Sequence, residues 1–167
     1  MSDTDPYVVS TDARVVDAAL AAAPDIVLAE LELAVLECQL LLEREVKERA
    51  PTSGAGTLRD SIGTLPLSLS GTALSGTVGT PLSYAVPVEL GSRPHRPPIA
   101  PLAEWVDRKL GIKGKAGQRV AWAIAGKIAK RGTPAHHMFG GALEAHRAQI
   151  GEIAQGAVER AMGRIGS

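Results

Sequence analysis

The sequence predicts an α+β fold in which a long central helix packs on a small antiparallel β-sheet or hairpin, with further helices toward the C-terminus. Three patterns indicate this fold. Apolar residues recur at helical spacing from residue 25 to about residue 49, alternate with polar residues from 65 to 78, and return to helical spacing after Pro101. Aromatic residues are only 3% of the chain, so the core must consist mainly of Leu, Val, Ile and Ala.

The first third of the chain is expected to form an extended arm, residues 1–10, a short Ala-rich helix that ends before Pro24, and then the long helix. The apolar stripe of the long helix follows steps of three and four residues: Leu28, Leu31, Val35, Cys38 and Leu42. A helix of this length spans roughly 37 Å, enough to cross a protomer. Leu33, Leu36 and Leu40 lie off the stripe, so either the chain itself surrounds this helix or part of it packs on a neighbouring subunit.

A β-hairpin is predicted between residues 65 and 78, after a Gly/Ser loop and one helical turn at 57–61. Leucines alternate with proline and serine before the Ser70-Gly71 turn, and apolar residues alternate with small polar ones after it. Pro66 has no backbone N–H to donate, so its strand should lie at a sheet edge or carry a bulge there.

The rest of the chain is predicted to be mainly helical. A short apolar element from Tyr84 ends at Gly91, and the exposed proline-rich loop that follows covers residues 92–101. Three helices are then expected: one from Pro101 to Gly111, one through Val120 that ends before Gly132, and one from about Gly141. In the first of these helices, one face carries Leu102, Trp105, Val106 and Leu110.

Length and composition favour one domain over residues 11–167, because a chain of 167 residues buries roughly 70% of its unfolded surface. The single cysteine, Cys38, cannot form an internal disulfide, which is typical of a protein made in a reducing cytosol. The sequence contains neither a secretory signal nor an uninterrupted apolar run of about 18 residues, so we expect no export and no membrane span.

No residues stand out as catalytic, metal-binding or cofactor-binding, and we do not expect an enzyme. His136 and His137 are adjacent and therefore point in different directions on a helix or a strand, which makes a poor metal site. The segment Gly54–Gly56 lacks the third glycine of a dinucleotide fingerprint and the Lys-Ser/Thr pair of a phosphate loop. No serine lies in a nucleophile elbow, and Cys38 within a predicted helix is a weak nucleophile candidate.

The net charge of the chain is zero, but the charges are unevenly distributed. Residues 1–61 hold 12 acidic and 5 basic side chains, whereas residues 92–132 hold 2 acidic and 10 basic ones. A neutral chain is not expected to use its whole surface for nucleic acid, and Trp105, which could stack a base, falls on an apolar stripe. One part of the chain is instead the electrostatic complement of another.

Six short runs carry a recognisable pattern in their order and spacing: Ala50-Pro51, Gly56–Ile62, Tyr84–Ser92, Pro101–Val106, Ala121–Thr133 and His137–Leu143. This pattern resembles the tail-completion, or head-tail joining, family of lambda-like siphophages over roughly residues 26–150. Two departures from the family pattern matter. The segment before Leu58 is longer than the family's Asp-Thr-Gly, and Met138 stands where the family tends to have proline.

The resemblance implies a protomer that forms a ring, expected to be a hexamer, between the head-tail adaptor or connector and the tail terminator or tail tube. DNA would pass through the centre of this ring. The chain would be synthesised in the host cytoplasm and found in the virion neck. The family-motif residues expected at packing or interface positions are Leu58, Arg59, Ser61, Ile62, Tyr84, Glu89, Gly91, Phe139, Ala142 and Leu143. Among them, Tyr84 and Phe139 are the largest apolar anchors.

A head-to-tail ring needs two different patches on each protomer, and the charge distribution supplies them. The acidic segment through Glu48 is expected to face a neighbour's basic region, in which the interface candidates are Arg93, Arg96, Lys127, Lys130 and Arg131. The competing use of the same basic residues is to line a lumen for DNA. The N-terminal arm and loop 92–101 are candidates for contact with the neighbouring layers.

The sequence is also consistent with two other functions. A tail terminator or a minor tail protein of the same neck region would have the same general fold. A small regulator that binds DNA or a partner helix belongs to a different class, and a dimer that binds a duplex in a gel shift would favour it.

Overall fold

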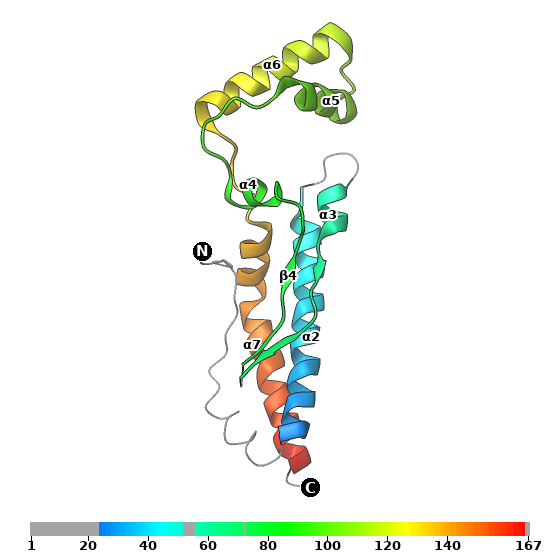
Figure 1. Cartoon of the computed structure of the whole chain (residues 1–167), viewed down its shortest axis with the longest axis vertical. Coiled ribbons are helices and arrows are strands. Elements are labelled where there is room, and N and C mark those ends of the chain that lie inside the picture. The colour runs from blue at the N-terminus through cyan, green and yellow to red at the C-terminus, as the bar shows by residue number, and fades with distance from the viewer. Residues whose placement is uncertain (1–23, 52–55, 72, 166–167) are drawn as a thin grey trace. The chain divides into compact units, whose positions relative to one another are not determined.

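The computed structural model of the chain is mostly helical and confirms the predicted α+β class (Figure 1). The residues that it describes are 24–51, 56–71 and 73–165. Two expectations lie outside these residues, the extended arm over residues 1–10 and the short helix that ends before Pro24.

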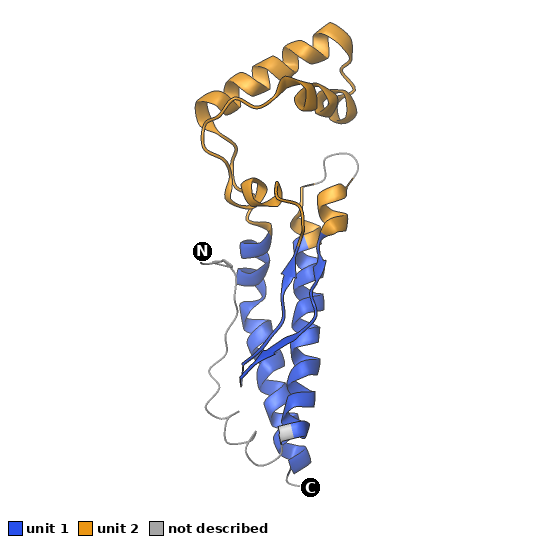
Figure 2. Cartoon of the chain, viewed as in Figure 1, with its two compact units in different colours: residues 1–46, 62–79, 139–167 blue, residues 47–61, 80–138 orange. Residues whose placement is uncertain are grey.

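The described residues group into two compact units, each with buried apolar residues of its own (Figure 2). The first unit takes parts of residues 1–46, 62–79 and 139–167, and the second takes parts of residues 47–61 and 80–138. The expectation of a single domain over residues 11–167 stays a prediction.

Two long helices make up most of the first unit, α2 (Pro24–Arg49) and α7 (Met138–Ile165), and they lie side by side (Figure 1). They run antiparallel, since Glu30 near the start of α2 pairs with Arg160 near the end of α7. Helix α2 confirms the predicted long helix, and α7 begins three residues before the predicted Gly141.

Apolar side chains hold these two helices together. On α2 the buried residues Val27, Ala34 and Leu41 recur at seven-residue steps, a spacing that keeps one helix face toward a partner helix. Val27 packs with Ala161 of α7, and Ala157 of the same helix is also buried. Small side chains on one helix let the two helix axes approach closely.

The predicted β-hairpin is confirmed, and its ladder is interrupted midway. One antiparallel pair joins β1 (Gly63–Thr64) to β4 (Val78–Gly79), and the pair nearer the turn joins β2 (Ser68–Ser70) to β3 (Ala73–Ser75). Pro66 lies in the gap between β1 and β2, where its missing N–H costs no ladder hydrogen bond.

Gln39 of α2 holds the hairpin at this interruption. Its buried side chain donates from Nε2 to the carbonyl oxygens of Leu65, at 2.9 Å, and Thr77, at 3.0 Å. Gly76 leaves no room for a side chain beside this contact, because a Cβ there would lie 2.7 Å from atoms of Gln39 and Val35. A polar side chain and a glycine thus fix where the hairpin contacts the helix.

Among the described residues, the second unit holds α3 (Thr57–Ser61), α4 (Ala85–Leu90), α5 (Ile99–Leu110) and α6 (Gly114–Arg131). Helices α5 and α6 pack against each other, with Val106 and Ala121 fully buried. The chain turns between them at Gly111, whose left-handed conformation ends α5. Leu110, the last helical residue on the predicted apolar face of α5, is 49% exposed.

Ser92 and Thr133 close the base of the α5–α6 hairpin. Their backbones exchange hydrogen bonds of 3.1 and 3.2 Å, and Thr133 Oγ1 donates to Ser92 Oγ at 2.9 Å. Each follows a glycine with positive φ, Gly91 at 75° and Gly132 at 70°. A Cβ on Gly91 would lie 2.7 Å from Thr133 O, and one on Gly132 would overlap Ser92 O. The two glycines therefore allow the two chain segments to lie in direct contact.

Candidate assembly surfaces

The outer face of α2 carries an exposed stripe of leucines. Leu33, Leu36 and Leu40 are 60%, 44% and 63% exposed, respectively. Their spacing of three and four residues places them side by side on the helix surface. Two arrangements were predicted for these leucines, and the residues that the structure describes do not bury them within the same chain. A contiguous row of exposed leucines is typical of a protein–protein contact.

Helix α4 carries a second exposed apolar patch. Val86 and Leu90 lie one turn apart and are 61% and 56% exposed. Tyr84, which was predicted at a packing or interface position, has a side chain that is 45% exposed. Tyr84 stands at the N-cap of α4, whereas the buried side of this helix is formed by Ala85 and Glu89. The motif segment therefore exposes apolar surface instead of burying it.

The buried carboxylate of Glu30 is paired within the first unit. It accepts hydrogen bonds from Arg160 at 3.0 Å and from Arg164 at 2.8 Å. The hydrogen bond from Arg160, followed by the one from Arg164, lowers the pKa of Glu30 below its ordinary value of 4.5. This acidic residue stabilises the α2–α7 pair and is not left for a neighbouring subunit.

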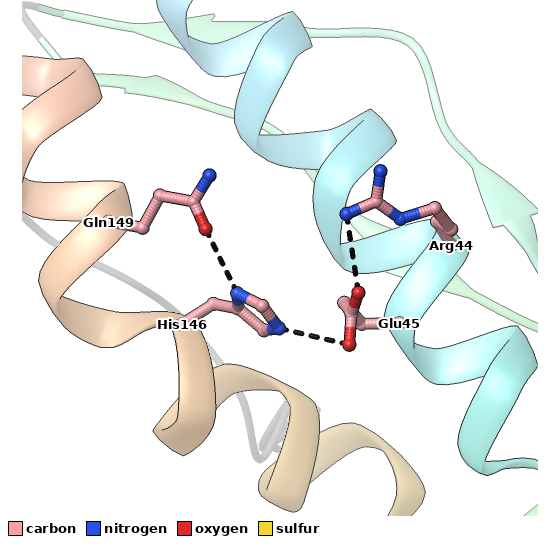
Figure 3. A network of polar contacts seen from close by, with 4 residues as sticks. All are labelled: Arg44, Glu45, His146 and Gln149. Atoms are coloured by element: carbon pink, nitrogen blue, oxygen red, sulfur yellow. Dashed lines mark hydrogen bonds and ion pairs between the residues drawn. The ribbon is translucent and has the colours of Figure 1, made fainter.

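Glu45 is the centre of a second polar network between α2 and α7 (Figure 3). One carboxylate oxygen lies 2.9 Å from Nε2 of His146, and the other lies 3.3 Å from Arg44. Nδ1 of His146 faces Oε1 of Gln149 at 3.0 Å. A carboxylate oxygen only accepts hydrogen bonds, so Nε2 of His146 donates to Glu45. The hydrogen bond from His146 is the main cause that lowers the pKa of Glu45.

The two carboxylates predict a loss of stability in acid. Both have a lowered pKa in the folded state, so their stabilisation is present above about pH 4.5 and is lost as the pH falls through the lowered values. Urea unfolding followed by circular dichroism, from about pH 7 to about pH 3, should show this fall. Glu30→Gln should reduce the acid-induced loss, whereas Glu32→Gln at an exposed site should not; equal curves for the two variants would contradict the assignment.

Most family-motif residues serve the fold of their own unit. Ser61 Oγ donates to Leu58 O at 2.7 Å and lies 2.7 Å from Thr80 Oγ1, which links α3 to the segment before α4. Gly91 belongs to the contact between Ser92 and Thr133. By exposure the remaining motif residues divide into buried Ile62, Glu89 and Ala142, half-buried Phe139 and Leu143, and exposed Arg59.

The predicted basic interface or lumen residues are all exposed: Arg93, Arg96, Lys127, Lys130 and Arg131. Their pairing with a neighbour's acidic segment stays a prediction. The exposed carboxylates of α2 that remain for such a pairing are Asp25, Glu32, Glu37 and Glu48, since Glu30 and Glu45 have partners within the protomer. Fewer carboxylates of α2 are therefore free for a neighbouring subunit than the count of acidic residues suggests.

An exposed tryptophan lies among the basic residues of α6, and the sequence did not single it out. Trp122 is 65% exposed, whereas Trp105, the base-stacking candidate of the sequence, is half-buried. The periodicity of α6 could have indicated that Trp122 is exposed. Ala121 and Ala125 mark the buried side of the helix, and Trp122 lies about 100° around the axis from Ala121.

Neither metal-binding nor membrane-spanning features are present in residues 24–51, 56–71 and 73–165. No three His, Cys, Asp or Glu side chains there lie together as possible metal ligands, and no helix there has the length and apolarity to cross a bilayer. No family model, curated protein or solved structure matches this chain. A functional assignment therefore rests on the sequence resemblance and on the surfaces described above.

Proposed function

We propose that this chain is a structural subunit in the neck of a long-tailed phage virion. Copies of it form a ring that completes the tail and joins it to the head connector, and DNA passes through the ring. The observation that carries this proposal is the exposed stripe of Leu33, Leu36 and Leu40 on α2. Exposed leucines at this spacing need a partner surface, which a second copy of the chain supplies. The resemblance to head-tail joining proteins supports the assignment and leads us to expect a hexamer.

A closed ring needs two different surfaces on each protomer, because each protomer contacts one neighbour on either side. We assign one surface to the α2 stripe and the other to Val86 and Leu90 of α4, within the motif segment. Each of these half-exposed side chains contributes about 1 kcal/mol when a neighbour removes it from water. Ring closure adds strength, because each protomer is then held by two interfaces at once.

Variants that lack one surface are expected not to form rings, yet to pair with each other. Leu33→Ser/Leu40→Ser removes the stripe, and Val86→Ser/Leu90→Ser removes the α4 patch. Each variant alone should be monomeric. An equimolar mixture should form a heterodimer and stop there, because the mixture retains one intact stripe and one intact α4 patch that fit each other. Native mass spectrometry of the parent, the two variants and the mixture measures these species.

Met162→Ser is the matched control, because Met162 is an exposed apolar residue of α7 that belongs to neither surface. It should form rings as the parent does. All variants should be folded by circular dichroism, since exposed substitutions change stability by about 0.5 kcal/mol or less. A parent protein that stays monomeric at every concentration contradicts the ring. Electron microscopy of mature particles tests the location, and absence of the protein from the neck contradicts it.

A further inference from the structure

Helix α6 presents a basic outer face with a tryptophan at its centre. The helix contains five basic and no acidic residues, Lys115, Arg119, Lys127, Lys130 and Arg131. All five are exposed, and none of them forms an ion pair with a described residue. Trp122 lies among them with 65% of its surface exposed. Unpaired cations around an exposed aromatic ring form a surface that attracts anions.

The residues of this face follow one line along the helix. Steps of four, three, four and four residues connect Lys115, Arg119, Trp122, Gly126 and Lys130. Residues three or four apart are neighbours on a helix surface, and the whole line is about 22 Å long at about 1.5 Å per residue. Charges spread over this length match an extended polyanion better than a single small anion.

A shallow hollow of about 430 Å³ opens on the same face, one turn from Trp122. Small residues, Ala123 and Gly126, and three cations, Lys127, Lys130 and Arg131, line it. A Cβ on Gly126 would meet nothing within 4 Å, so the space above the helix backbone is open there. A phosphate group can therefore approach the helix closely between cations.

The helix dipole accounts for only part of this arrangement. Cations in the last turn, such as Lys130 and Arg131, are favoured by the dipole whatever their function. Lys115 in the first turn is placed against the dipole, and Arg119 and Trp122 lie too far from the C-terminus to benefit.

Membrane binding does not account for the basic face either. An interfacial helix needs a free apolar face to enter the lipid. The apolar side of α6, which includes the buried Ala121 and Ala125, is already packed against α5.

We propose that the outer face of α6 binds the sugar–phosphate backbone of DNA. Lys115, Arg119 and Lys130 contact phosphates, the hollow over Gly126 receives one of them, and Trp122 stacks on a base where the strand is unpaired. The inference deepens the proposed function by naming the surface that touches the DNA, but it rests on α6 alone. It favours the DNA-lining use of these basic residues over their use as a subunit contact.

The test is fluorescence anisotropy with the full chain, a short labelled single strand and the corresponding duplex, at increasing salt. Lys115→Gln/Arg119→Gln should weaken binding of both DNAs and lower the slope of log affinity against log salt by about 2 for the duplex. Trp122→Ala should weaken the single strand about fivefold or more and the duplex much less. Gly126→Leu should weaken both, because its side chain fills the hollow while leucine is a better helix former than glycine.

Arg108→Gln/Lys109→Gln is the matched control, because it removes the same charge from exposed residues of α5 in the same unit. It should bind DNA nearly as the parent does. Absence of DNA binding at low salt, or equal losses in the control and the α6 variants, overturns the proposal. Binding to anionic lipid vesicles without binding to DNA also overturns it, and so does a loss of rings without a loss of DNA binding in the Lys115→Gln/Arg119→Gln variant.

Native mass spectrometry of the same samples separates this proposal from the ring. Rings that do not bind DNA overturn the role of α6 and leave the proposed function standing. DNA binding by a protein that never forms rings overturns the proposed function and leaves the role of α6 standing.

Discussion

Replacing Gly132 with alanine is expected to destabilise the second unit by about 3 kcal/mol or more. Gly132 has φ 70° and ψ −160°, a conformation that is nearly exclusive to glycine. A Cβ there would also overlap the carbonyl oxygen of Ser92 on the opposite segment. The overlap is relieved only if the segments separate, and separation breaks the Ser92–Thr133 hydrogen bonds at the base of the α5–α6 hairpin.

Tryptophan fluorescence measures this effect in the unit concerned. The two tryptophans of the chain, Trp105 and Trp122, lie on α5 and α6, so urea unfolding followed by their emission reports on this hairpin. Gly111→Ala is the matched control, because Gly111 has φ 69° but a Cβ there would meet nothing within 4 Å. Its cost should be about 1 kcal/mol. If Gly132→Ala costs no more than this control, close approach to Ser92 is not the reason for glycine at position 132.

The long helices could be predicted because their signal is local. The three- and four-residue steps from Leu28 to Leu42 were sufficient to predict helix α2, and contacts with distant residues did not change its secondary structure. The apolar stripe of α6 begins at Val120, and the start of the helix at Gly114 was not predicted, because Gly114 and Gly117 weaken the helical pattern of its first turns. The structure supplies the reason for Gly117, which is buried and whose Cβ would overlap the carbonyl oxygen of Ile112. The small size of Gly117 allows close packing at the α5–α6 turn. Helix propensity is a local property and does not predict this requirement.

The surfaces were harder to predict, because exposure depends on residues far apart in the chain. Glu30 and Arg160 are separated by 130 positions, and nothing local indicates that they pair. In the sequence, Glu30 is one of the acidic residues predicted to face a neighbouring subunit. In the fold, its carboxylate is paired with Arg160 and Arg164. Tyr84 is the opposite case, a large apolar residue in a motif that suggests an anchor, yet 45% exposed. A neighbouring subunit or a ligand contacts exposed side chains. The candidate sites in the structure therefore differ from those predicted from the sequence.

Gln39→Met is expected to loosen the hairpin from α2 and to lower the free energy of unfolding by about 2 kcal/mol. Only the NH₂ group of an amide can face two carbonyl oxygens, so Nε2 is the atom that donates to Leu65 O and Thr77 O. Methionine keeps the volume of the side chain and removes both donors. Thr77 O retains the hydrogen bond from Leu65 N at 2.9 Å, whereas Leu65 O loses the donor from Gln39. The loss should therefore concentrate at the interruption of the ladder.

Hydrogen exchange at the Leu65 amide distinguishes loosening of the hairpin from a general loss of stability. Exchange there should accelerate more in Gln39→Met than exchange in the middle of α7, because the carbonyl that accepts from this amide is itself held by Gln39. Gly76→Ala should act at the same place, since its Cβ would lie 2.7 Å from Gln39 and Val35, whereas Gly79→Ala meets nothing within 4 Å and should be mild. Because Gln39 and Gly76 contact each other, their effects should not add in the double variant. Additive losses, or an unchanged exchange rate at Leu65, would mean that Gln39 does not hold the hairpin to α2.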